Sequence, residues 1–228
     1  MRIGVLLSGC GVYDGAEIHE AVLSLLAIDE IGAEALCISI NAPQHHVINH
    51  ATGEEMNEQR NMLIESARIS RGNIINIQDL NPSELDALVI PGGFGSAKNL
   101  TNWAFLGPNG NVRDDVKSLI VNIIRIGKPL LVLCVSPVVV AKALEGSGIK
   151  ANLAIGSKNN SSPYSIEDFQ KGMESIGATT VDKGITEILI DHSNRIITAP
   201  CYMMDASISQ VRSNIKMAMD ALKELCNG

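Results

Sequence analysis

The sequence predicts an α/β fold in which a mostly parallel β-sheet is covered by helices on both faces. Four short runs of Val, Ile and Leu show no alternation of polar and apolar residues, which is typical of strands buried on both faces. These predicted strands are Arg2–Leu7, Ala35–Ile40, Ala87–Ile90 and Leu130–Cys134. The chain has 228 residues, of which 46% are hydrophobic, so it can form a sizeable core. Because no internal repeat or linker divides the chain, we expect a single domain over residues 1–228.

Segments with helical periodicity separate the predicted strands. The first has an apolar stripe that stops at Gly32 and consists of Ile18, Val22, Leu25, Leu26 and Ile31. Ser165 is expected to cap a later helix, because Asp168 follows three residues on and Gly177 lies after its end. The predicted helices after the first are Met56–Arg71, Val112–Ile126, Ser165–Ile176 and Asp205–Cys226.

Turn residues mark the remaining segments. Ile185–Ile190 and Arg195–Thr198 flank Asp191-His192-Ser193-Asn194, which predicts a hairpin added antiparallel to the sheet. Three stretches rich in Asn, Gly, Pro or Ser are predicted to be loops at the sheet edge or near a site. They are Asn41–Gly53, Asn99–Asn111 and Ser157–Tyr164.

Charge and cysteine usage restrict the class of protein. The net charge is −7 and no block of Lys and Arg occurs, so we expect neither nucleic acid nor an anionic membrane as a partner. The N-terminal apolar run is too short for a signal sequence or a membrane span. Five scattered cysteines without a Cys-x-x-Cys pair argue against zinc knuckles and favour a reducing cytosol, so the expected location is cytoplasmic. His45, His46 and His50 with Glu54 lack the paired helical spacing of metal ligands, and we expect no metal.

Cys134 ends a buried strand, and Pro137 fits the first turn of a helix that follows. A cysteine in a strand-to-helix turn has the geometry of a nucleophile elbow, which lifts the side chain out of the sheet. The helix N-terminus is expected to lower the pKa of this thiol. The alternative is that Cys134 is a small core residue, as free cysteines often are.

A second segment, Asp86–Gly95, runs from a buried strand into the glycine-rich turn Pro91-Gly92-Gly93-Phe94-Gly95. Backbone N–H groups in such a turn can stabilise a developing oxyanion. The alternative is a tight turn that needs glycine for its geometry alone. A phosphate loop is disfavoured, because no Gly-Lys-Ser/Thr follows the glycines.

The third segment, Ser8–Glu20, is a loop at the carboxyl end of the first strand, where sites form in doubly wound sheets. Glu17 can reach the Cys134 thiol from the start of the first helix. The alternative is a capping box with Asp14 as N-cap and Glu17 at N3. Cys10 lies in the same loop, where a redox partnership with Cys134 competes with simple packing. Cys37 and Cys201 are interpreted as core residues.

These segments resemble the ElbB family, which is glyoxalase-like and belongs to the PfpI-type branch of the class I glutamine amidotransferase-like superfamily. The resemblance covers nearly the whole chain and rests on Ser8–Glu20, Val47–Glu54, Pro91–Leu100 and Ile196–Met203. It implies a flavodoxin-like fold, no cofactor and a small aldehyde or dicarbonyl as substrate. It also implies that Cys134 is the reactive cysteine, with Glu17 beside it. The N–H groups of Gly93 and Val135 would form the oxyanion hole, and Gly92 would contribute to binding.

The chain also departs from its amidotransferase relatives. Glutaminases of the superfamily carry glycine at the positions where this chain has Val132 and Ser136. They also use a His-x-Glu pair late in the chain, whereas here His192 is followed by Ser193-Asn194. Ala154–Lys158 holds no histidine where deglycase relatives have one. We therefore expect no glutaminase activity. Two functions remain open: a slow, cysteine-dependent conversion of dicarbonyls, of the glyoxal-to-glycolate type, and a non-enzymatic redox-sensing or binding module. We also expect a homodimer.

Overall fold

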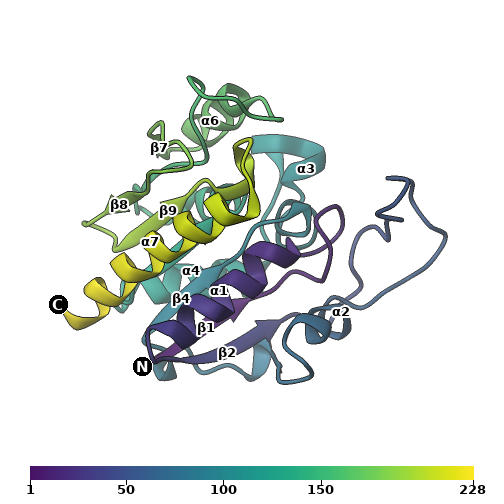
Figure 1. Ribbon diagram of the computed structural model, residues 1–228, viewed down its shortest axis with the longest axis horizontal. Coiled ribbons are helices and arrows are strands. Elements are labelled where there is room, and N and C mark those ends of the chain that lie inside the picture. Colours follow the sequence, from purple (N-terminus) through teal and green to yellow (C-terminus); the bar gives the residue numbers. More distant parts are fainter.

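The computed structural model describes residues 1–228 and contains a seven-stranded sheet with helices around it (Figure 1). The strand order is β3-β2-β1-β4-β5-β9-β8, and every neighbouring pair is parallel except the antiparallel pair of β8 and β9. The strands are β1 (Arg2–Leu6), β2 (Glu34–Ser39), β3 (Ile75–Asn76), β4 (Ala87–Ile90), β5 (Leu130–Leu133), β8 (Leu189–Asp191) and β9 (Ile196–Ala199). This arrangement confirms the predicted fold class and the antiparallel hairpin.

The central strands form the middle of the core. Every residue of β4, β5 and β9 is buried, as continuous apolar runs predict for parallel strands covered on both faces. The core as a whole joins 54 buried residues from the sheet and its helices, and Trp103 is the largest of them.

Seven α-helices accompany the sheet. They are α1 (Ile18–Glu30), α2 (Met62–Ile69), α3 (Trp103–Leu106), α4 (Asp114–Arg125), α5 (Pro137–Leu144), α6 (Ile166–Ser175) and α7 (Ile208–Asn227). In Figure 1, α1 and α7 lie side by side over the near face of the sheet, and α4 lies behind it. None of these helices combines the length and the apolar character that a membrane span requires.

The second helix begins later than predicted. The N–H group of Met56 donates to the Val47 carbonyl at 2.7 Å, so this part of the chain pairs across a loop instead of forming a helical turn. The side chain of Asn61 then caps α2 by accepting a hydrogen bond from the N–H group of Ile64 at 3.2 Å. Residues 41–61 consequently project from the body of the molecule.

Tertiary contacts also change three other predicted segments. The expected loop Asn99–Asn111 contains α3 and the end of a short π-helix over Ser96–Leu100. A small parallel sheet of β6 (Asn152–Leu153) and β7 (Thr179–Thr180), which the sequence did not predict, packs with α6. Ser165 makes no side-chain cap to α6, whereas Ser207 and Gln210 form a capping box at the start of α7.

Candidate functional site

Cys134 lies directly after β5 with φ = 56°, a left-handed conformation that residues other than glycine rarely adopt. Its N–H group donates to the Ala199 carbonyl at 3.0 Å, which holds the turn against the end of β9. Pro137 follows at the first position of α5. A strained, tethered cysteine between strand and helix is the geometry of a nucleophile elbow.

Two backbone donors point at the Cys134 sulfur. The N–H groups of Gly93 and Val135 both interact with it, and both act to lower the pKa of the thiol. Gly93 has φ = 97°, and a Cβ atom there would lie 2.3 Å from the nitrogen of Glu17. Only glycine therefore brings this N–H group to the sulfur. Gly93 and Val135 therefore lie beside the Cys134 sulfur, and their role as an oxyanion hole stays a prediction.

The carboxyl group in contact with the thiol belongs to Glu20, on the first turn of α1. Its Oε2 accepts a hydrogen bond from the Gly92 N–H group at 2.9 Å, and its Oε1 accepts one from the Tyr202 N–H group at 3.3 Å. The same carboxyl lies next to the side chain of Cys134, and each group shifts the pKa of the other. Glu20 is fully buried. This burial, together with the charge of Glu17, raises the pKa of Glu20 to about 8.

Glu17 does not occupy the position expected for it beside the thiol. It is the N-cap of α1, and its Oε2 accepts a hydrogen bond from the Glu20 N–H group at 2.7 Å. The N–H group of Glu17 donates to the Gly92 carbonyl at 2.9 Å, which decides where the helix begins. Asp14 is not the cap, because its Oδ2 accepts from the Ile48 N–H group instead. The signal for Glu20 was present in the sequence as a second glutamate three residues after Glu17, one helical turn further on.

The thiol is also less acidic than its place before a helix suggests. Burial and the negative charge of Glu20 raise the pKa of Cys134 well above its ordinary value. The N–H groups of Gly93 and Val135 oppose this shift without cancelling it. The expected lowering of the pKa is therefore wrong, because burial of the thiol and, after it, the charge of Glu20 outweigh the helix N-terminus.

Ser136 stands where glutaminases have glycine, and it supports the glycine turn. Its Oγ donates to the Pro91 carbonyl at 2.7 Å and lies 2.9 Å from Ser96 Oγ. Ser96 Oγ also donates to the Pro91 carbonyl, at 3.2 Å. All of these groups are buried, so the two hydroxyls fix the turn of Gly92 and Gly93 against the elbow.

The cysteine beside Cys134 is Cys201 rather than Cys10. Cys201 is buried, as expected of a core residue, and its N–H group donates to Asn214 Oδ1 at 3.1 Å. Burial raises its pKa, and the charges of Glu20 and Cys134 add to this effect. The charges that act on Cys10 come instead from Glu65, Arg68 and Asp14.

No histidine hydrogen-bonds to the thiol–carboxyl pair. His19 is exposed, and its Nδ1 lies 2.9 Å from the hydroxyl of Tyr202. His50 stacks on Tyr13, and His45 packs against Phe105. No group of three His, Cys, Asp or Glu side chains has a metal-binding arrangement.

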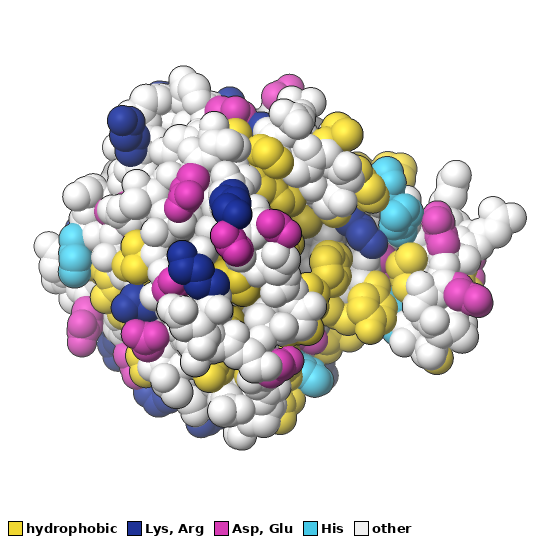
Figure 2. Space-filling model, turned by 90° about the horizontal axis from the view of Figure 1, so that it is seen from above, with side chains coloured by type: hydrophobic (Ala, Val, Ile, Leu, Met, Phe, Trp, Pro, Cys, Tyr) yellow, Lys and Arg dark blue, Asp and Glu magenta, His cyan; other side chains and the backbone are white.

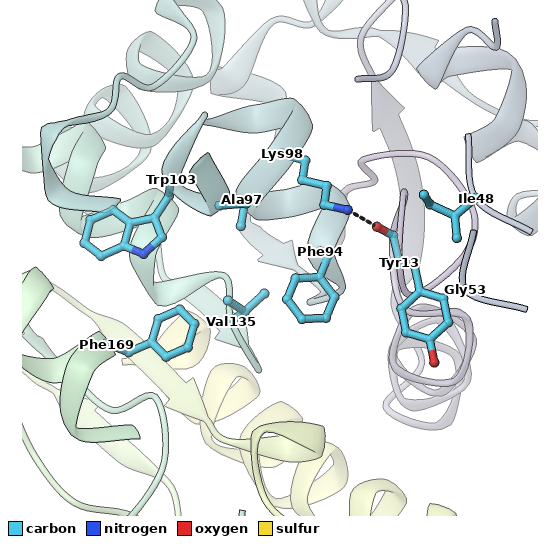
Figure 3. A pocket seen from close by; sticks show the side chains of 10 residues that line it. Tyr13, Ile48, Gly53, Phe94, Ala97, Lys98, Trp103, Val135 and Phe169 are labelled. Atoms are coloured by element: carbon cyan, nitrogen blue, oxygen red, sulfur yellow. Dashed lines mark hydrogen bonds between the residues drawn. The ribbon is translucent and has the colours of Figure 1, made fainter. Parts of the chain in front are cut away.

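An apolar pocket of about 440 Å³ adjoins the elbow (Figure 3). Its lining comes from five parts of the chain and consists of Tyr13, Ile48, Gly53, Phe94, Ala97, Lys98, Trp103, Ala104, Val135 and Phe169. In Figure 2 hydrophobic side chains gather in a hollow beside the projecting segment, with basic and histidine side chains at its rim. Sequence reasoning did not find this pocket, because its residues meet only in the folded chain.

Comparison with known proteins identifies the family. The mitochondrial ES1 protein homolog of Rattus norvegicus is 36% identical over 228 residues, which cover 98% of this chain and 84% of the relative. The mitochondrial glutamine amidotransferase-like class 1 domain-containing protein 3 of Homo sapiens is 35% identical, over 98% of this chain and 83% of the relative. The chain belongs to this ES1 and ElbB-like family. No protein-family model matches the chain.

Solved structures agree with the family assignment. The isoprenoid biosynthesis protein with amidotransferase-like domain from Ehrlichia chaffeensis superposes with a TM-score of 0.88 at 32% identity, over 98% of this chain and 99% of that chain. Drosophila melanogaster DJ-1beta has a TM-score of 0.54 at 17% identity, over 100% of this chain and 96% of that chain, which shows a shared fold. These likenesses confirm the ElbB-like family and the flavodoxin-like, amidotransferase-like fold.

The cytoplasmic location expected from the cysteines is contradicted, because the rat and human relatives in the ES1 and ElbB-like family are mitochondrial proteins. All five cysteines of this chain are free thiols. Free thiols indicate a reducing compartment, but they do not tell one reducing compartment from another.

Proposed function

We propose that this chain is a cofactor-free, cysteine-dependent enzyme of the glyoxalase-like type, which converts small dicarbonyls to hydroxy acids. The observation that supports this function is the contact of the Cys134 thiol with the Glu20 carboxyl, under two N–H groups that point at the sulfur. At neutral pH a carboxyl with a pKa of about 8 is mostly protonated, so it can donate a proton as well as accept one.

In the first step the sulfur of Cys134 forms a bond to one carbonyl carbon of glyoxal. The π electrons of that carbonyl move to its oxygen, which the N–H groups of Gly93 and Val135 stabilise. Glu20 gives its proton to this oxygen and takes the proton of the thiol. The product of this step is a neutral hemithioacetal.

In the second step the C–H hydrogen of the hemithioacetal carbon moves with its electron pair to the adjacent carbonyl carbon, and the hydroxyl proton of the hemithioacetal moves to the oxygen of that carbonyl. The first carbon becomes a thioester and the second becomes a carbinol. Water then breaks the C–S bond, its hydroxyl stays on carbon, and its proton returns to the sulfur. The sum is glyoxal plus water giving glycolic acid, with no external oxidant or reductant.

Glycolate release from glyoxal, followed by mass spectrometry, tests this proposal. Cys134→Ala should abolish release, and Glu20→Gln should reduce it by about 10²–10⁴-fold, as expected for loss of a general acid–base group. Cys37→Ala removes another buried thiol and serves as the matched control. Equal glycolate release by wild type and Cys134→Ala would contradict the proposal.

A second candidate function is a non-enzymatic redox sensor, which the absence of an imidazole at the thiol favours. A hydroperoxide would oxidise the Cys134 thiol to a sulfenic acid and be reduced to an alcohol. Peptide mass spectrometry after peroxide treatment, on a protein that releases no glycolate, would support this alternative.

We also propose that the chain forms a homodimer. Ile18, Val22 and Leu26 lie at successive turns of one face of α1, and between 41% and 47% of each residue is exposed. An apolar stripe of this kind on a soluble surface is typical of an interaction site.

A further inference from the structure

The lining of the pocket includes the residues that directly follow Cys134 and Gly93 in the chain. The N–H group of Val135 acts on the Cys134 thiol, and Val135 also lines the pocket. Phe94 directly follows Gly93, the other donor, and its ring forms part of the same wall. A carbonyl compound bound at the sulfur therefore has this apolar space next to its remaining atoms.

The pocket is much larger than glyoxal, which has only two carbons and two oxygens. Its volume of about 440 Å³ lies in the range of cavities that hold whole drug-sized ligands. Eight of the ten lining residues are hydrophobic. Each methylene that a ligand buries there should tighten binding about fourfold. A substrate with an apolar group would bind more tightly by burying that group in the pocket, whereas glyoxal has no such group.

Lys98 is the one charged residue in the lining. Its ammonium donates to the Tyr13 carbonyl at 2.8 Å and lies 5.8 Å from the centre of the Phe94 ring, and neither of these partners is an anion. Burial lowers the pKa of Lys98, although the charges of Asp14 and Glu55 act in the opposite direction. A carboxylate or phosphate on the ligand would provide a charge-assisted hydrogen bond.

Lys98 and the aromatic pair Trp103 and Phe169 lie at opposite ends of the pocket. Figure 3 shows Trp103 and Phe169 together at one end and Lys98 with Tyr13 at the other. Phe94 and Val135, which adjoin the two N–H donors, lie between these ends. From one end to the other, the pocket therefore offers two aromatic rings, then the place where a ligand's carbonyl would reach the N–H donors, and then an ammonium group.

We infer that the substrate is a carbonyl compound larger than glyoxal, with an aryl or alkyl group between Trp103 and Phe169 and an anionic group at Lys98. This inference rests on the proposed function, because it takes the reacting group to be a carbonyl. It names the substrate class that the same site would prefer.

Binding can be tested apart from turnover, because Trp103 is the only tryptophan in the chain and its fluorescence reports on the pocket. The probe is 4-oxo-4-phenylbutanoate, a ketone that carries both a phenyl and a carboxylate group. Acetophenone lacks the carboxylate, and 4-oxopentanoate lacks the phenyl group. We expect the complete probe to bind at least about tenfold more tightly than either fragment, since one charge-assisted hydrogen bond contributes about that much.

Lys98→Gln should weaken binding of the probe to the level of acetophenone, and Phe169→Ala should weaken it toward that of 4-oxopentanoate. Lys171→Gln removes the same charge from a lysine that pairs with Glu167 on the surface, and it should bind like wild type. Thermal melting of each variant checks that it is folded. Unchanged affinity in Lys98→Gln, or equal affinity for the probe and both fragments, would overturn the inference.

The Cys134→Ala variant separates this inference from the proposed function. It should still bind the probe through Lys98 while releasing no glycolate from glyoxal. The chain could release glycolate in a Cys134-dependent way and yet bind the probe no more tightly than its fragments. That result would support the proposed function and refute the substrate class. Tight, Lys98-dependent binding without turnover of any dicarbonyl would refute the function.

Discussion

Glu20 and Cys134 form a neighbouring carboxyl–thiol pair in which burial raises the pKa of both groups. At neutral pH both members therefore hold their protons, and the pair carries no charge. Because the carboxyl and the thiol interact, the first proton that is lost above about pH 8 comes from the pair as a unit and is not assigned to one group alone. The chemistry of the site therefore depends on how this pair loses its first proton.

Alkylation of Cys134 by iodoacetamide should respond in opposite directions to two glutamate substitutions. Glu20→Gln removes the charge that raises the pKa of the thiol, so Cys134 should react about tenfold faster at pH 8.5. Glu17→Gln removes a charge that raises the pKa of Glu20. Glu20 then ionises at lower pH, and Cys134 should react more slowly. Peptide mapping gives the rate at this residue, and identical pH profiles for the two variants would contradict the assignment of Glu20.

Folding stability should fall as the pH rises from about 4.5 to about 8, because of Glu20. Its pKa in the folded chain is about 8, against an ordinary value of 4.5, so the folded state holds a proton that the unfolded state has lost. The effect is at most about 5 kcal/mol over this range. In the Glu20→Gln variant this side chain cannot ionise. Its unfolding free energy, measured by urea titration, should therefore change less between pH 5 and pH 8 than that of the wild type. An equal change in wild type and variant would show that this carboxyl is not buried as a neutral group.

Gly92→Ala should disrupt the site. A Cβ atom at this position would lie 2.3 Å from Cys134 Cβ and 2.5 Å from Glu20 Oε2, so the elbow or the carboxyl must move. We expect a loss of about 1–3 kcal/mol in unfolding free energy, as for overpacking in a core, together with loss of any Cys134-dependent activity. Gly184→Ala is the matched control, because its nearest neighbour would be a side-chain atom at 3.3 Å. Melting curves and glycolate release measure the two effects.

Glutamine should not be hydrolysed by this chain. Glutaminases of the superfamily use a histidine to activate the thiol and protonate the leaving nitrogen, and no histidine hydrogen-bonds to Cys134 or Glu20. Glu20 holds its own proton at neutral pH, so it does not replace that free base. Ammonia release by purified protein should equal that of Cys134→Ala. Rapid release that is lost in Cys134→Ala would reverse this conclusion, and further loss in His19→Ala would identify the missing base.

A charged residue on the exposed stripe of α1 should dissociate the proposed homodimer. Val22→Glu places a carboxylate at the centre of the stripe, where a partner surface would have to desolvate it. Light scattering should then give the mass of a monomer. Ile64→Glu, at an apolar residue of α2 that is 63% exposed, should leave the mass unchanged. A wild-type chain that is monomeric at all concentrations would disprove the homodimer.

The sequence by itself determined the parallel sheet and the positions of the two turns at the site. Strands buried on both faces must be continuously apolar, so β1, β2, β4 and β5 were visible without the structure. The positions of the elbow at Cys134 and of the turn at Gly93 follow from chain neighbours, namely Pro137 and the adjacent glycines, so local rules were sufficient to locate them. The backbone conformation of the elbow is also held by a distant group, the Ala199 carbonyl.

Only the tertiary structure decided which carboxyl meets the thiol and what space lies beside it. Glu17 and Glu20 are one helical turn apart, and the long-range hydrogen bond from Glu17 to the Gly92 carbonyl decides which of them caps α1. The raised pKa values of Glu20 and Cys134 result from burial under segments far apart in the chain, among them Tyr202. The pocket likewise joins five segments that have no common sequence pattern. Burial and contacts between distant residues exist only after folding, and for that reason local sequence patterns did not predict them.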